Sequence, residues 1–331
     1  MSTRTVENPK VVSREEWLVA RKKLLAKEKQ LTRQRDAIAA ERRQLPWVKV
    51  EKNYAFDSPS GKKTLADLFD GRSQLIVYHF MFGPEWQEGC PSCSFNMDHT
   101  DGALVHLAQR DAIAAERRQL PWVKVEKSYG FDSPSGKKTL ADLFDGRSQL
   151  IVYHFMFGPE WQEGCPSCSF NMDHTDGALV HLAQRDVSFA AVSRAPISKI
   201  EAFKKRMGWK FPWVSSYETK FNYDFQASFT PEQLAKGKVE YNYDLVQFPS
   251  AEAPGVSVFY KDKDGNIFHT YSAYARGSEN TINTYNYLDL VPKGRDEDNL
   301  PFTMAWLRHH DRYETGYLAD PDRPYWPKAA G

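Results

Sequence analysis

A near-identical internal repeat constrains this 331-residue chain more than any other feature of its sequence. Residues 34–111 and 109–186 match at a period of 75 residues. They differ at two positions, Asn53 against Ser128 and Ala55 against Gly130. Solenoid repeats diverge from one another and need at least three units, so this pattern indicates one segment that was copied once.

Removing one copy leaves a single uninterrupted domain, because only the second copy runs directly into the next predicted strand, residues 187–192. The expected organisation is an N-terminal helical arm at 1–45, a duplicated partial module at 46–109 and a complete domain at 110–331. The reverse assignment stays open. The first copy could complete the sheet and the second be extruded, since the two are nearly interchangeable.

Composition argues for a soluble globular protein with no unusual partner. Apolar residues make up 41% and charged residues 26%, and the net charge is +1. This balance gives no reason to expect nucleic acid or an acidic membrane surface as a partner. No signal-peptide stretch and no membrane-length apolar run occurs, so we expect a cytoplasmic location.

The N-terminal segment 13–44 has the pattern of a long charged helix. Ser13 and Glu16 form a capping-box start, and Pro46 is a plausible stop. Four apolar residues repeat at intervals of seven and would form one stripe: Trp17, Leu24, Leu31 and Ile38. The stripe would pack either on its own domain or on a second subunit, which would make a homodimer through this helix.

The second copy contains a strand, a crossover helix and another strand, the unit that builds a parallel sheet. These are an apolar strand at 149–157, a helix from 165 to about 184 and a strand at 187–193. Around this unit we expect a strand at 122–126, a turn at 131–136, a short helix at 140–144, a helix at 197–207 and a β-hairpin at 255–261 and 267–274. The order is that of an α/β protein with the thioredoxin-like fold, with an aromatic-rich insertion at 208–254.

All four cysteines of the chain lie in two copies of Cys-Pro-Ser-Cys, as Cys90 with Cys93 and Cys165 with Cys168. Partners only three positions apart close too short a loop to stabilise the fold as a structural staple. Cys165 follows a buried strand and opens a helix, where unpaired amide groups favour a thiolate. Pro166 suits the first helical position. Cys165 is therefore the expected nucleophile and Cys168 the resolving thiol.

A zinc half-site is the alternative interpretation of such a pair. Zinc sites usually have a second pair some 15–20 residues on, whereas here the second pair lies 75 residues away and is a duplicate. We therefore expect no metal and no cofactor. For Cys90 and Cys93, an inert role is as open as a catalytic one, because their half-module lacks the rest of a site.

With these motifs in place, the chain resembles thioredoxin-like proteins in general. More closely, it resembles a bacterial family of unknown function labelled predicted dithiol-disulfide oxidoreductases. The residues that carry this resemblance are Tyr153-His-Phe-Met-Phe-Gly158, Glu160-Trp-Gln-Glu-Gly-Cys-Pro-Ser-Cys-Ser169, His174, Phe211-Pro-Trp-Val-Ser-Ser216, Met304-Ala-Trp306 and His309-His-Asp-Arg-Tyr313. They span nearly the whole chain apart from the extra copy.

The resemblance implies several further residues of the site. A cis-proline faces the dithiol in thioredoxins, and Pro254 occupies the matching place before a strand. Pro254, Pro166 and Trp161 are therefore the expected substrate-binding residues. His154 could act as a proton acceptor or be a satisfied core histidine.

Three functions follow as hypotheses. The first is a thiol-disulfide oxidoreductase that acts on a disulfide-containing protein or a small thiol and needs an unidentified reductant. The second is a thioredoxin-like binding module that holds a metal or an iron-sulfur cluster. The third is a peroxiredoxin-like peroxide reductase, although Gln162 stands where peroxiredoxins have a threonine.

Deleting residues 35–109 should leave a folded protein, since the remainder reads as one complete domain. Urea unfolding followed by circular dichroism checks this expectation. Loss of the cooperative transition in the shortened chain would show instead that the first copy is integrated into the core.

Overall fold

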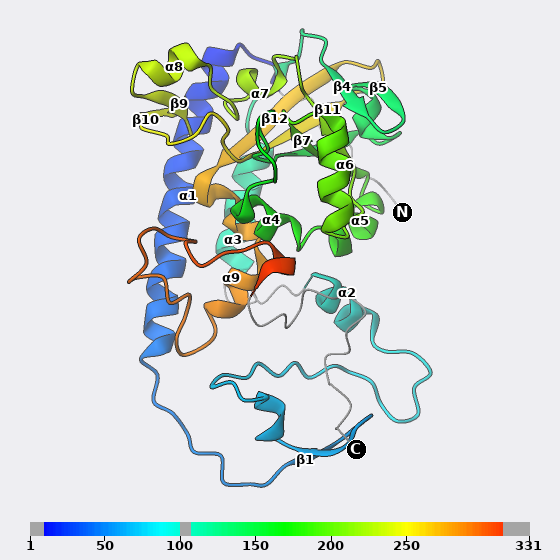
Figure 1. Cartoon of the computed structure of the whole chain (residues 1–331), viewed down its shortest axis with the longest axis vertical. Coiled ribbons are helices and arrows are strands. Elements are labelled where there is room, and N and C mark those ends of the chain that lie inside the picture. The colour runs from blue at the N-terminus through cyan, green and yellow to red at the C-terminus, as the bar shows by residue number, and fades with distance from the viewer. Residues whose placement is uncertain (1–9, 100–106, 314–331) are drawn as a thin grey trace. The chain divides into compact units, whose positions relative to one another are not determined.

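The computed structural model describes residues 10–99 and 107–313, and the chain divides into two compact units (Figure 1). Unit 1 comprises residues 1–33 and 103–282, and unit 2 comprises residues 34–102 and 283–331. Among the described helices, none is both long enough and apolar enough to cross a membrane. The domain boundaries expected from the sequence stay a prediction.

Unit 1 is built on an eight-stranded sheet of order β3-β12-β11-β6-β7-β8-β4-β5. Its strands are β3 (Val123–Lys124), β4 (Gly130–Ser133), β5 (Gly136–Thr139), β6 (Gln149–His154), β7 (Val187–Ser193), β8 (Trp213–Ser215), β11 (Gly255–Lys261) and β12 (Ile267–Tyr274). β6 runs parallel to β7 and antiparallel to β11, which forms a hairpin with β12. This is the expected mixed α/β, thioredoxin-like plan of a βαβ unit followed by a hairpin.

Strand β6 is apolar on both faces because both faces are covered. Leu150 and Val152 belong to a core cluster with Phe144 and Phe221 on one face. On the alternate positions, Tyr153 belongs to a second cluster, with residues of the crossover helices. The continuous apolar run in the sequence therefore marks the central strand, as expected.

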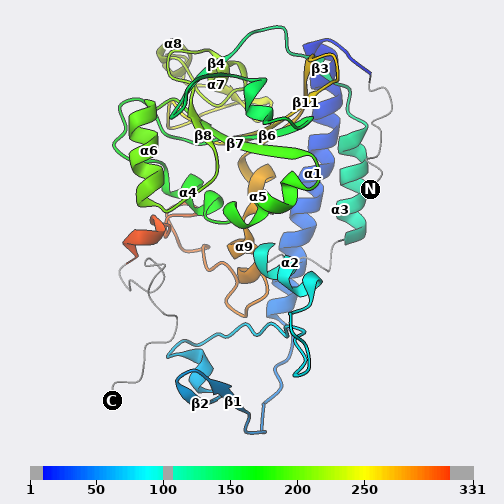
Figure 2. The ribbon, with the colours of Figure 1, turned by 90° about the vertical axis from the view of Figure 1, so that its right-hand side faces the viewer.

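Three helices contribute to the second cluster: α4 (Pro166–Met172), α5 (Asp176–Ala183) and α6 (Ile197–Arg206) (Figure 2). The single helix expected from residue 165 to about 184 is thus wrong, because it is interrupted between Met172 and Asp176. After the break, the Asp176 carboxylate accepts hydrogen bonds from the amides of Lys210 and Phe211, at 2.8 and 2.9 Å. The start of α5 is tied in this way to the chain that leads into β8.

Three further segments of unit 1 differ from or extend the sequence-based expectation. The turn expected at 131–136 lies inside a β-hairpin, in which β4 pairs with β5. The expected short helix is one turn, η3 (Asp142–Phe144), with Thr139 bonded to Asp142. The insertion and its flank hold α7 (Phe221–Asp224), α8 (Pro231–Ala235), β9 (Val239–Tyr241), β10 (Asp244–Val246) and η4 (Ala275–Thr281).

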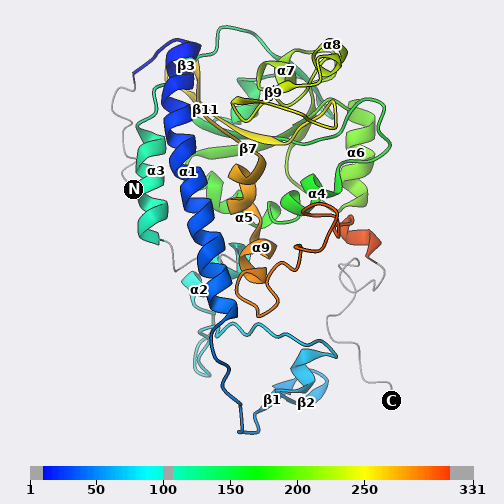
Figure 3. The same cartoon turned by 90° about the vertical axis from the view of Figure 1, so that its left-hand side faces the viewer.

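The long helix α1 (Arg14–Arg43) begins with the expected capping box, in which Ser13 and Glu16 exchange hydrogen bonds of 3.1 and 3.2 Å. Its first part packs within unit 1, where Trp17 is buried among aromatic side chains. Helix α3 (Leu107–Arg118) lies beside this part of α1 (Figures 2 and 3). Leu24 of α1 contacts Ile113 and Leu120 in a small apolar cluster.

A buried ionic network also attaches α1 to the sheet. Glu28 is paired with Arg21 at 2.7 Å and with Arg117 of α3 at 2.8 Å. The Tyr271 hydroxyl on β12 donates to the same carboxylate at 2.8 Å. Arg21 also donates from Nε to the Ser272 carbonyl at 2.9 Å. Because Arg21 is fully buried, Glu28 is the counter-charge that makes its burial tolerable.

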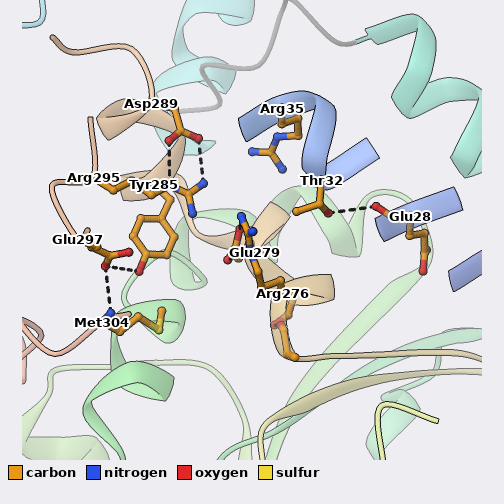
Figure 4. Close-up of polar contacts among 12 residues, drawn as sticks. Glu28, Thr32, Arg35, Arg276, Glu279, Tyr285, Asp289, Arg295, Glu297 and Met304 are labelled. Carbon is orange, nitrogen blue, oxygen red and sulfur yellow. Dashed lines mark hydrogen bonds and ion pairs between the residues drawn. The ribbon is translucent and has the colours of Figure 1, made fainter. Parts of the chain in front are cut away.

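Unit 2 holds β1 (Ala55–Ser58), β2 (Gly61–Thr64), η1 (Asp67–Phe69), α2 (Pro91–His99), α9 (Asn283–Leu288) and η5 (His310–Arg312). Glu297 organises its C-terminal part (Figure 4). One oxygen of this carboxylate accepts hydrogen bonds from the Tyr285 hydroxyl, the Trp306 indole and the Met304 amide, at 2.8, 2.7 and 3.1 Å. Arg295 lies over the Tyr285 ring.

The two copies of the repeat share local structure but not long-range structure. The hairpin β1–β2 has the register of β4–β5, and Asp70 and Asp145 both take left-handed conformations, with φ of 49° and 48°. Residues 74–79, however, form no strand, although their sequence is that of β6. Val77 is 50% exposed, whereas its counterpart Val152 is fully buried. The hairpin and the turn therefore form from the local sequence alone. The sequence of β6 becomes a strand only where it lies between β7 and β11.

The Glu28 network generates a stability prediction with an adjacent control. Glu28→Ala should destabilise the protein by about 3–5 kcal/mol, because it leaves the buried Arg21 without a counter-charge. Lys27→Ala removes a largely exposed ion pair with Glu116 and should cost about 0–1 kcal/mol. Urea denaturation midpoints of the two variants test this. Equal midpoints would mean that the network does not stabilise the fold.

Candidate functional site

The second Cys-Pro-Ser-Cys motif lies where the chain leaves β6 and enters α4, at the carboxyl end of the central strand. Cys165 is the N-cap of α4, in an extended conformation, and Pro166 is its first residue. The Cys165 amide donates to the Met156 carbonyl at 3.0 Å, which fixes the motif against the end of β6. Cys165 is partly exposed and Cys168 is buried, and both are free thiols.

Hydrogen bonds hold Cys165 ready to ionise. The thiol of Cys168 donates to Cys165 and contributes most to lowering the pKa of Cys165 to about 7. Burial acts in the opposite direction, and the Cys168 and Ser167 amides add further stabilisation of the thiolate. A substantial share of Cys165 is therefore thiolate at neutral pH, the form that attacks disulfides.

Cys168 has the opposite character. Burial raises its pKa well above the ordinary value, and the hydrogen bond and charge of Cys165 add to the effect. Hydrogen bonds from the Met156 amide, at 3.4 Å, and from Tyr153 oppose the rise only in part. The two thiols thus differ in exposure and in pKa.

Two tyrosines near the dithiol were not anticipated from the sequence. Tyr153 on β6 is hydrogen-bonded to Cys168, and burial raises the pKa of its hydroxyl well above the ordinary value. Tyr241 on β9 is electrostatically coupled to Cys168, and its hydroxyl donates to the Pro254 carbonyl at 2.8 Å. Neighbouring residues of a strand point to opposite faces, so Tyr153 and His154 lie on different sides of β6, but the continuously apolar sequence of this strand does not indicate which side faces the dithiol.

Pro254 stands immediately before β11, but the expectation of a cis bond is wrong. No peptide bond among the described residues is cis, so the Ala253–Pro254 bond is trans. Trans is the favoured isomer of an X-Pro bond, and the local pairing is consistent with it. The Ala253 amide donates to the Ala227 carbonyl at 2.9 Å, and Gly255 pairs with His154 of β6. Pro254 therefore lies beside the end of the strand that leads to the dithiol.

His154 belongs to the other face of the sheet. Its ring stacks on Phe221 with centroids 5.5 Å apart, and its Nε2 lies 2.9 Å from the Ser257 hydroxyl. Burial lowers the pKa of His154 to about 3, so the imidazole is neutral at physiological pH. The placement fits the core-histidine alternative and takes His154 away from the side of β6 that carries Tyr153.

Trp161 lies in the loop between β6 and the dithiol and packs against the same core cluster as Cys165 and Cys168. Its amide donates to the Gly158 carbonyl at 3.1 Å, and Lys199 of α6 donates to its carbonyl at 3.1 Å. Pro166 is exposed next to Cys165. The three positions expected to bind substrate, Trp161, Pro166 and Pro254, thus lie on segments that adjoin the dithiol or the end of β6, while their roles stay a prediction.

At Gly164, immediately before Cys165, there is no room for a side chain. A Cβ at this position would lie 2.6 Å from the Phe155 ring and 2.8 Å from the Phe203 ring. The peptide between Trp161 and Cys165 therefore passes directly over the aromatic core. This packing holds the loop close to the end of β6.

The first motif repeats the local geometry of the second. The Cys90 amide donates to the Met81 carbonyl at 3.0 Å, and the Met81 amide donates to the sulfur of Cys93 at 3.5 Å. The pKa of Cys90 is lowered, chiefly by the Cys93 amide. This motif does not follow a strand as the second motif does, because residues 74–79, the counterpart of β6, form no strand. Cys90 and Cys93 are therefore a dithiol without the surrounding core.

Within residues 10–99 and 107–313, no three histidine, cysteine, aspartate or glutamate side chains converge as a metal site requires.

Comparison with known proteins places the chain in a family. A family model described as "Bacterial protein of unknown function (DUF899)" matches residues 6–112 and again residues 108–313. The chain belongs to this family. The two matches meet near the junction of the two copies, and the second contains the complete set of motifs from Cys165 to Tyr313. A search of curated proteins found no match.

Solved structures offer only distant likenesses to this DUF899 protein. Peroxiredoxin Q of Xanthomonas campestris is 13% identical, with a TM-score of 0.34 over 46% of this chain and 84% of that one. Peroxidoxin BcpB of Mycobacterium tuberculosis is 14% identical, with a TM-score of 0.30 over 50% and 92%. A putative protein disulfide isomerase of Bacteroides thetaiotaomicron is 16% identical, with a TM-score of 0.27 over 52% and 85%. The fold is described by the strand order of the sheet in unit 1.

The site generates a prediction about pH. In a Cys90→Ser/Cys93→Ser chain, alkylation of Cys165 should rise with pH and level off above a midpoint near pH 7. Adding Cys168→Ala should move the midpoint upward, because it removes the hydrogen bond that favours the thiolate most. Iodoacetamide rates measured across pH provide the test. A midpoint at or above about 8.5, the value of a free cysteine, would contradict the described geometry.

Proposed function

We propose that this protein is a thiol-disulfide oxidoreductase in which Cys165 attacks a disulfide and Cys168 resolves the product. The observation that carries the proposal is the asymmetry of the pair. Cys165 is partly exposed with a pKa of about 7, and Cys168 is buried with a raised pKa. An inert structural pair has no need of such a difference.

The reaction proceeds by two exchanges that balance in sulfur and in electrons. The Cys165 thiolate attacks one sulfur of the substrate disulfide, a Cys165–substrate bond forms, and the other sulfur leaves as a thiolate that takes up a proton. Cys168 then loses its proton and attacks the sulfur of Cys165, which releases the second substrate thiol. The substrate gains two electrons, and the protein is left with a Cys165–Cys168 disulfide that an external dithiol must reduce.

The surroundings of Cys168 make its ionisation depend on the state of Cys165. The charge on Cys165 is one of the causes that keep the pKa of Cys168 high. Once Cys165 is bonded to substrate it no longer carries that charge, and this cause disappears. The hydrogen bonds from Tyr153 and from the Met156 amide stay in place and favour the Cys168 thiolate at that stage. Cys168 therefore becomes easier to ionise when it is needed.

The surroundings of Cys165 support a proposal for the class of substrate. Cys165 is only partly exposed, and the segments of Trp161, Pro166 and Pro254 adjoin it or the end of β6. These residues offer apolar surface and, at Pro254, a backbone carbonyl that is already bonded to Tyr241. We propose a disulfide-containing protein or a small disulfide as the substrate.

Single-thiol variants test the assignment of roles. In a Cys90→Ser/Cys93→Ser chain, Cys168→Ser should accumulate a mixed disulfide with a substrate such as oxidised glutathione or insulin. Cys165→Ser should form none, because the remaining thiol is buried and protonated. Intact-mass spectrometry under non-reducing conditions measures both products. Full disulfide reduction by the Cys165→Ser chain would refute the proposal.

A further inference from the structure

We propose that residues 34–99 can replace residues 109–174 in unit 1, so that the first Cys-Pro-Ser-Cys pair becomes the working dithiol of a second active-site state. The redox part of this inference rests on the function proposed above, whereas the exchange of segments does not depend on it.

The place of β6 in the sheet has two candidate occupants. β7 on one side and β11 on the other pair with residues 149–154. Residues 74–79 have the same sequence. Every contact that this sequence makes in unit 1, with either core cluster, is therefore available to the first copy as well. Outside the sheet, the first copy leaves apolar side chains such as Val77 exposed, as β6 would if it were displaced.

The two positions at which the copies differ do not obstruct the exchange. Ser128 is exposed, so Asn53 meets no packed surface there. A Cβ on Gly130 would have no atom within 4 Å, so Ala55 fits in its place. Ala55 already pairs with Thr64 in β1–β2, as Gly130 pairs with Thr139 in β4–β5. The hairpin of the first copy is thus formed with the required register.

The helical segments of the two copies also match in sequence. Residues 34–43 and 109–118 are identical in sequence. In α3, Arg117 pairs with Glu28 and Glu116 with Lys27, and the counterparts in the first copy are Arg42 and Glu41. In the exchanged state α1 ends near Arg33, where the division between the two units falls. Residues 34–43 then fold back against α1 as α3 does now.

Exchange within one molecule is favoured over exchange between molecules. Each chain can hold one central strand and has two segments that can form it. Two chains that exchange segments therefore form no more central strands than two separate chains do. The competing segment is on the same chain and therefore has a high effective concentration. The two folds differ at their junctions, at two exposed side chains and at contacts that the first copy now makes in unit 2, such as the 2.9 Å hydrogen bond from Arg35 to Asn286. Most of their other interactions are the same, which brings the two folds close in free energy.

Matched substitutions in the two copies test the exchange in the full chain. Val152→Asp puts a carboxyl group into a fully buried strand position, and Val77→Asp puts one at the counterpart that is 50% exposed. We expect each single variant to keep a cooperative urea transition in the oligomeric state of the wild-type chain, and the double variant to lose the transition. The inference is overturned if Val152→Asp alone unfolds as the double variant does. It is equally overturned if the double variant stays folded, or if the folded Val152→Asp chain is found only in a larger assembly than the wild-type chain.

The identity of the working dithiol is tested on the same background. In the Val152→Asp chain, disulfide reduction should be lost on Cys90→Ser and retained on Cys165→Ser, and the wild-type chain should show the stronger dependence on Cys165. If the Val152→Asp chain instead loses activity on Cys165→Ser and keeps it on Cys90→Ser, the proposal of a second active site is overturned. If no chain reduces a disulfide, the proposed function fails while the unfolding result still decides whether the segments exchange.

Discussion

Backbone pairing of β6 with β7 on one edge and with β11 on the other fixes the place of the dithiol. The strand ends at His154, and the chain then passes through a short loop to Cys165. Two hydrogen bonds attach both cysteines to the end of that strand. The Cys165 amide donates to the Met156 carbonyl, and the Met156 amide donates to the sulfur of Cys168. Pro254 comes to the same edge because β11 pairs antiparallel with β6.

The repeat separates what the local sequence determines from what the surrounding core determines. Turns, the β1–β2 hairpin and the bonds inside the Cys-Pro-Ser-Cys loop form in both copies, since their partners lie a few residues away. The strand does not, because its partners β7 and β11 lie far along the chain and can accept only one copy. An extended apolar segment alone has unpaired backbone groups and becomes a strand only beside other strands.

Much of the fold could be predicted from the sequence, and the detail of the site could not. The continuous apolar run at 149–157, the helix start at Cys165 and the hairpin from 255 to 274 are local patterns that a few neighbouring residues are enough to identify. A strand covered on both faces shows no alternation of apolar and polar residues, so the sequence did not tell that Tyr153 would face the dithiol while His154 faces away. The contribution of Tyr241 depends on how the insertion folds, and short apolar segments of that kind carry little periodic signal.

The contact of Gly164 with two phenylalanine rings has a consequence for how this site can vary among proteins of the family. The residue before Cys165 is set by steric exclusion, since any Cβ there would overlap Phe155 and Phe203. Variation next to the dithiol is then expected at side chains that are exposed on the loop, such as those of Glu160 and Gln162, or in the segment around Pro254. Diversification at this rim leaves the geometry of the sulfur atoms untouched.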